Sequence, residues 1–137
     1  MKTILVGYDG SEESKNALAR AADLATALGS KVAVTSVAPM LITAGRSMGP
    51  YDPADPPEAH ESQLGEARTL LEARGITPTL EEGHGDPADV ILEVADKVDA
   101  DLVVLGAHER SIVERALGMS VSGEVARKSH RDVLIVH

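Results

Sequence analysis

The sequence contains no cysteine, no tryptophan and no phenylalanine, and its aromatic residues are limited to Tyr8 and Tyr51. Without cysteine, the chain can form neither a disulfide framework nor a thiolate metal site, and it has no cysteine nucleophile. So few aromatic rings leave no stacking platform for a flavin or for single-stranded bases. These absences argue against disulfide-rich domains, zinc-thiolate proteins and flavodoxin-like flavin carriers.

Basic residues are also scarce, because 13 Lys and Arg stand against 22 Asp and Glu and give a net charge of −9. An acidic surface repels phosphate backbones and anionic lipid, so we expect no nucleic-acid partner. No apolar run approaches the roughly 20 residues that a bilayer crossing needs. The amino terminus shows no signal-peptide pattern. We therefore expect a cytoplasmic protein without membrane insertion.

The hydrophobic pattern predicts an α/β fold in a single domain over residues 1–137. Short apolar runs alternate with longer amphipathic segments, which is typical of a parallel sheet covered by helices on both faces. The predicted strands are Thr3–Tyr8, Val32–Val37, Thr77–Glu81, Leu102–Leu105 and Val133–Val136. The first, fourth and fifth runs are almost uninterrupted, as expected of central strands buried on both faces. Pro78 predicts an edge position for the third.

Four amphipathic segments predict helices. They are Ser11–Leu28, Glu58–Arg74, a segment beginning at Asp86-Pro87, and Ser120–Ser129. Leu28 in the first and Val121 in the last are expected to face the core. Gly29 supplies a left-handed stop, and Asp86 accepts hydrogen bonds from free amides. The segment Ala38–Pro57 holds five of the seven prolines and predicts a flexible surface loop, with a lid over a ligand as the alternative.

Candidate site residues follow the first and fourth strands, because doubly wound sheets bind ligands beyond the carboxyl ends of their strands. Asp9 could bond a ribose hydroxyl or a base amine, or it could cap the first helix alongside Ser11. Gly106 ends the fourth strand. The serines at Ser120–Ser122 fit either an anion site at a helix start or a simple cap. Neither GxxxxGK[ST] nor GxGxxG occurs, the histidines lack metal-ligand spacing, and no activated nucleophile is evident, so no catalytic residue and no metal site are predicted.

The motif order resembles that of the universal stress protein family over nearly the whole chain. The matching segments are Ile4–Ser11, Gly85–Pro87, Asp101–Gly106, Ser120–Ser122 and Asp132–Val136. The resemblance implies a Rossmann-like, five-stranded parallel sheet in the order 3-2-1-4-5, with two helices on each face. It also implies a homodimer formed through the last strand, whose residues are Val133, Leu134, Ile135 and Val136.

Family members that bind AMP, or ATP with Mg²⁺, resemble the pattern G-x2-G-x9-G-[ST]. By this resemblance the nucleotide-binding positions are Asp9, Val37, Gly106, Ser120, Val121 and Ser122. Two positions depart from the pattern, since Glu109 and Met119 stand where the second and third glycines belong. A carboxylate repels phosphate, and a side chain at the third glycine restricts close approach of the backbone.

Two hypotheses about function follow. The first is a non-catalytic stress-response regulatory module with a degraded nucleotide crevice, which acts through contacts with other proteins. The second is an AMP- or ATP-binding sensor, or a slow ATPase, of the same family. The departures at Glu109 and Met119 favour the first, while Arg110, Arg115 and Gly118 could restore part of the site.

Overall fold

The computed structural model describes residues 1–36, 57–83, 85–107 and 121–137, and of residues 57–61 it describes only the backbone. The strands are β1 (Thr3–Tyr8), β2 (Lys31–Ser36), β3 (Thr79–Glu81), β4 (Leu102–Gly106) and β5 (Asp132–Val136). The helices are α1 (Glu12–Leu28), α2 (Pro57–Glu72), α3 (Pro87–Lys97) and α5 (Val121–Lys128). All neighbouring strands are parallel, in the order β3-β2-β1-β4-β5. The predicted fold class and strand order are confirmed.

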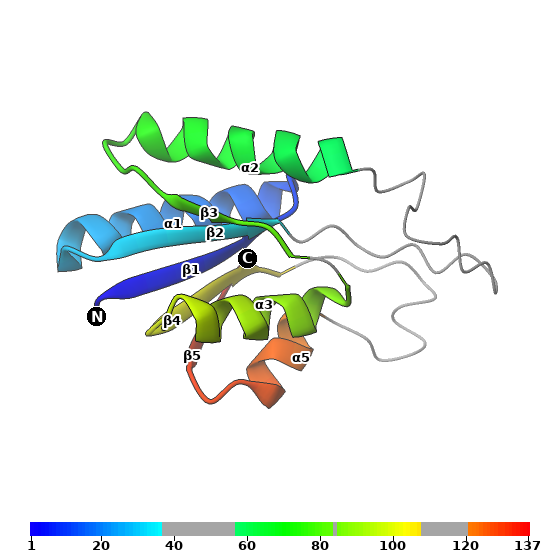
Figure 1. Cartoon of the computed structure of the whole chain (residues 1–137). Coiled ribbons are helices and arrows are strands. Elements are labelled where there is room, and N and C mark those ends of the chain that lie inside the picture. Colours follow the sequence, from blue (N-terminus) through cyan, green and yellow to red (C-terminus); the bar gives the residue numbers. More distant parts are fainter. Residues whose placement is uncertain (37–56, 84, 108–120) are drawn as a thin grey trace.

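In the described ranges, helices α1 and α2 cover one face of the sheet and helices α3 and α5 cover the other (Figure 1). Because side chains alternate along a strand, β1 sends Ile4 to one face and Leu5 to the other. Ile4 shares a buried cluster with Leu18 of α1 and Leu71 of α2, and we call this side the α1/α2 face. Leu5 shares a second cluster with helices α3 and α5, for example with Ile91, on the α3/α5 face. None of the helices in the described ranges has the length and apolar character that a membrane crossing requires.

Helices α1 and α3 begin where their capping residues predict. The Ser11 side chain accepts a hydrogen bond from the Ser14 amide at 3.2 Å, which satisfies an amide with no partner inside the helix. Asp86 caps α3 in the same way. Gly29 closes α1 with a φ of +67°, in the left-handed region that favours glycine. Short-range chemistry therefore fixes these helix ends.

Several predicted bounds differ from the structure. Strand β3 begins two residues later than expected, because Pro78 has no amide to donate to the ladder. It is nevertheless an edge strand, as predicted. Helix α2 begins one residue early, at Pro57, and ends at Glu72, two residues before the predicted end. The structure does not describe Val37, Ser120 or residues 38–56, where the sequence predicts a loop.

Three expectations about burial are wrong. The apolar fifth run is an edge strand and not a central one, since β5 pairs with β4 alone in the sheet and is buried only at Val136. An unbroken apolar run is typical of central strands, but it equally suits an edge that another surface covers. Leu28 and Val121 are 52% and 37% exposed. Both are terminal residues of their helices, so each has helix neighbours on one side only.

Candidate functional site

The strand order reverses between β1 and β4, since β2 and β3 lie on one side of β1 and β4 and β5 on the other. Ligands of doubly wound sheets bind at such a switch point, along the edge where the strands end, which we call the carboxyl edge. Asp9 follows β1 directly, and Gly106 is the last residue of β4. The structure therefore brings these two predicted site residues to the same edge.

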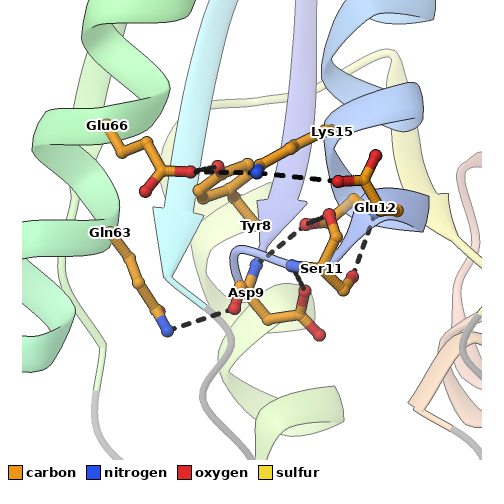
Figure 2. Close-up of polar contacts among 8 residues, drawn as sticks. Tyr8, Asp9, Ser11, Glu12, Lys15, Gln63 and Glu66 are labelled. Carbon is orange, nitrogen blue, oxygen red and sulfur yellow. Dashed lines mark hydrogen bonds and ion pairs between the residues drawn. The ribbon is translucent and has the colours of Figure 1, made fainter.

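Asp9 lies in a tightly bonded turn at this edge (Figure 2). Its carboxylate accepts a hydrogen bond from the Ser11 amide at 2.9 Å, and its own amide donates to the Ser14 hydroxyl at 3.4 Å. That hydroxyl donates in turn to the Ser11 carbonyl at 2.9 Å. Gly10 makes the turn possible with a φ of +83°. Ser11 alone caps the helix, while Asp9 braces the turn before it.

Gln63 of α2 connects the Asp9 turn to the end of β2. Its side-chain nitrogen donates to the Asp9 carbonyl at 3.2 Å, as Figure 2 shows, and its side-chain oxygen accepts from the Ser36 hydroxyl at 2.6 Å. Ser36 is the last residue of β2 and is buried. The sequence reasoning did not identify either residue. A polar position on the inner side of α2, next to the buried Leu64, was the available signal.

Gly106 has a packing role at the carboxyl edge. A Cβ atom on this residue would lie 2.5 Å from the Glu13 carbonyl carbon and 2.7 Å from the Ser14 nitrogen. These are backbone atoms of the first turn of α1, so they can give way only if the helix moves. Glycine here allows the Asp9 turn and the start of α1 to lie directly against the end of β4.

Tyr8 is fully buried on the α1/α2 face, and its hydroxyl donates to the Glu66 carboxylate. Lys15 lies 3.8 Å from carboxylate oxygens of both Glu66 and Glu12 (Figure 2). Burial, followed by the hydrogen bond and negative charge of Glu66, raises the pKa of the Tyr8 phenol well above its ordinary value. Tyr8 therefore remains a neutral donor that ties β1 to α2.

Thr35 is a further residue that the sequence reasoning missed. It is fully buried, and among the described residues its hydroxyl has no hydrogen-bond partner. Because Ala33 belongs to the cluster on the α3/α5 face, alternation along β2 places Thr35 on the same face. It pairs in register with Gly7 of β1, close to the carboxyl edge. A buried hydroxyl without a partner costs about 1–3 kcal/mol, which a ligand could offset.

The predicted phosphate site at the last helix is described only in part. Val121, the first residue of α5, is exposed, and Ser122 is half-buried. Val37, Ser120, Glu109 and Met119 lie outside the described residues. Within the described ranges, no three His, Asp or Glu side chains gather in a way that could hold a metal ion.

Comparison with known proteins identifies the family. The sequence matches the model of the universal stress protein family over residues 1–137. The chain belongs to the universal stress protein family. The resemblance carried by the Ile4–Ser11 and Gly85–Pro87 segments is thereby confirmed.

Individual universal stress proteins match along almost the whole chain. Stress response protein NhaX of Bacillus subtilis strain 168 is 30% identical, over 97% of this chain and 96% of its own. Universal stress protein Rv1636 of Mycobacterium tuberculosis strain H37Rv is 31% identical, over 99% of this chain and 96% of its own. A crystal structure of a universal stress protein in complex with cAMP is 34% identical and has a TM-score of 0.75, covering 99% of this chain and 97% of that one.

Proposed function

We propose that this universal stress protein is a non-catalytic regulatory module that binds an adenosine monophosphate at the carboxyl edge and acts through contacts with other proteins. The observation that carries the proposal is the Asp9 carboxylate, held at the switch point by the Ser11 amide. A carboxylate there can accept hydrogen bonds from ribose hydroxyls or from a base amine. The 34% identical structure that contains cAMP supports a ligand of this class.

Other groups at the carboxyl edge fit such a ligand. The Thr35 hydroxyl is buried and has no partner within the described part of the chain, so a hydrogen bond to a ligand would offset its desolvation cost. We propose that Val37 and Gly106 contact the ligand through their main chains. The phosphate would be bound by Ser120 and by Val121 and Ser122, the first two residues of α5. Main-chain amides at a helix start bind anions without a basic side chain.

A single phosphate suits this chain better than three. Glu109 and Met119 occupy the positions at which the pattern of ATP-binding family members has its second and third glycines. A carboxylate about 5 Å from one phosphate charge costs about 3 kcal/mol at an effective dielectric constant of about 20. This corresponds to roughly a hundredfold loss of affinity, and further phosphates increase the repulsion. The crevice is thus degraded for ATP, and an ATPase activity is not part of the proposal.

The serine hydroxyls beside Asp9 stabilise the turn and are not arranged for nucleophilic catalysis. Ser11 accepts from the Ser14 amide, and Ser14 donates to the Ser11 carbonyl. Both hydroxyls are therefore engaged in stabilising the turn. A nucleophilic serine needs a general base that takes its proton, whereas here the proton of Ser14 is directed to a carbonyl.

Isothermal titration of the full chain with AMP, cAMP and ATP tests the proposal. We expect AMP or cAMP to bind, and ATP to bind at least about tenfold more weakly. Asp9→Asn should weaken AMP binding by about tenfold or more, because a charged acceptor is lost. The matched control is Asp23→Asn, which removes an exposed α1 carboxylate paired with Arg74 and should leave the affinity unchanged.

A double variant tests why the chain is expected to bind ATP more weakly than AMP. The combined change Glu109→Gly and Met119→Gly should raise ATP affinity more than AMP affinity. Micromolar binding of ATP to the wild-type chain would contradict the preference for a monophosphate. Absence of heat with all three nucleotides would overturn nucleotide binding altogether.

We also propose that two copies of the chain pair along β5. Strand β5 ends the sheet, and Val133, Leu134 and Ile135 are only half-buried. An apolar edge strand left uncovered invites pairing with another strand. A second β5 in a homodimer would cover this edge and satisfy its outward main-chain groups.

A further inference from the structure

We infer that Gln63 of α2 is a positioning residue for the proposed nucleotide site. Its side chain holds the Asp9 turn at a fixed place relative to the end of β2, and it senses whether the site is occupied. The inference rests on the proposed function, because it concerns the same Asp9 carboxylate. It adds Gln63, a residue of α2, to the site. Neither the sequence analysis nor the family pattern assigned this helix a role there.

The contacts of Gln63 span the two strand ends that flank the site. Its Nε2 atom donates to the Asp9 carbonyl at 3.2 Å, and its Oε1 atom accepts from the Ser36 hydroxyl at 2.6 Å. Figure 2 shows the side chain reaching from α2 to the turn below β1. One amide thereby connects β1, β2 and α2 at the carboxyl edge.

The orientation of this amide is determined by its partners. The Asp9 carbonyl can only accept a hydrogen bond, so the NH2 group must face it. The amide oxygen then faces Ser36, whose hydroxyl must donate. The reverse orientation would bring two acceptor oxygens together at Asp9. The contact with the Asp9 carbonyl therefore determines the orientation of the amide.

Helix α2 gives this amide a rigid base. Leu64, Ala67 and Leu71 are almost fully buried in the core of the α1/α2 face. Glu66, one turn along the helix from Gln63, accepts the Tyr8 hydroxyl. Because groups on packed helices hold their geometry better than groups on loops, Gln63 can set the position of the Asp9 turn.

A ligand bound to the Asp9 carboxylate affects Gln63 through Asp9 itself, because Gln63 bonds the carbonyl of that residue. The Asp9 carboxylate and the Asp9 carbonyl are joined by three single bonds, and the carboxylate also accepts a hydrogen bond from the Ser11 amide. A nucleotide that bonds the carboxylate changes the balance of these contacts. The hydrogen bond from Gln63 to the carbonyl changes with it.

Nuclear magnetic resonance can observe this effect directly. Gln63 is the only glutamine of the chain and Asn16 the only asparagine, so an ¹⁵N-labelled sample gives two side-chain NH2 pairs. We expect AMP to move the Gln63 pair and to leave the pair of Asn16, exposed on α1, in place. Gln63→Met assigns the signal by removing it. A Gln63 pair unmoved at saturating AMP would overturn the inference.

Two variants test positioning by affinity. Gln63→Met removes both hydrogen bonds at similar length, and Gln63→Glu keeps an acceptor for Ser36 but has no donor for Asp9. Each should weaken AMP binding by about three- to tenfold, the effect of one neutral hydrogen bond. The matched control, Glu72→Gln on the same helix, removes an exposed carboxylate that pairs with Arg68 and should retain wild-type affinity.

These outcomes separate the inference from the proposed function. If wild-type chain and AMP give neither heat nor a spectral change, the proposed function is wrong. If AMP binds, and Asp9→Asn weakens it while both Gln63 variants bind as the wild type does, only the positioning role is wrong. Thermal unfolding of each variant establishes that it is folded before titration.

Discussion

Gly106 illustrates how a single residue sets the shape of the carboxyl edge. An added methyl group would meet the Glu13 carbonyl carbon at 2.5 Å, which is shorter than real side-chain contacts. Gly106→Ala should therefore lower the free energy of unfolding by about 1–3 kcal/mol, because α1 must shift to relieve the overlap. Urea denaturation of the wild type and the variant measures this difference.

Gly65 provides the matched control for that substitution. It lies within α2, where an added Cβ meets no atom within 4 Å. Gly65→Ala should raise the free energy of unfolding by about 0.5–1 kcal/mol, since alanine is the better helix former. Equal effects of the two glycine substitutions would show that the contact with α1 does not constrain position 106.

At the residue level, the sequence placed residues at the carboxyl edge where the signal was local. Asp9 follows β1 directly and Gly106 ends β4, so the topology brings both to that edge. Gln63 was missed because its partner Asp9 is 54 residues away in the chain. Thr35 was missed because a strand pattern does not reveal whether a buried hydroxyl finds a partner. Both facts depend on packing between elements.

At the scale of elements, the start of β1 depends on a carboxylate beside β4. Asp101 accepts hydrogen bonds from the Thr3 amide at 3.0 Å and from the Lys2 amide at 2.6 Å. The amide of Thr3, and then that of Lys2, hold the pKa of Asp101 below its usual value. The charged form is therefore favoured in the folded state, and the two amides anchor the first strand.

This arrangement predicts a dependence of stability on pH. The Asp101 contribution is present above the unfolded-state pKa of about 3.9 and is lost as the pH falls through the lower folded-state value. Asp101→Asn should reduce stability near neutral pH and make the decline below about pH 4 shallower. Urea denaturation from pH 7 to pH 3 provides the comparison, and parallel curves for wild type and variant would contradict this assignment.

The ends of helices and strands could be predicted best where residues close in the sequence determine them. Ser11, Gly29 and Asp86 act within one helical turn, so their sequence positions sufficed. The apolar fifth run predicted a central strand, whereas β5 lies at an edge of the sheet. Hydrophobicity alone does not show how many strands pair with a given strand. Strand order followed instead from the motif order that resembles the family.

At the scale of the whole molecule, the open edge at β5 predicts self-association. We expect a dimer in light scattering coupled to size-exclusion chromatography. Ile135→Lys should shift the chain toward the monomer, because a charge would be placed in the strand that pairs. The control Leu70→Lys alters an exposed leucine on α2 and should leave the dimer intact. A monomeric wild type would contradict pairing along β5.

Tyr8 has a practical consequence for the molecule as a whole. With no tryptophan in the chain, intrinsic ultraviolet emission comes from tyrosine alone. One of the two emitters is the buried Tyr8, which immediately precedes Asp9 and contacts a carboxylate that can quench it. The protein therefore carries a built-in optical reporter beside the proposed binding edge, and no dye or label needs to be attached.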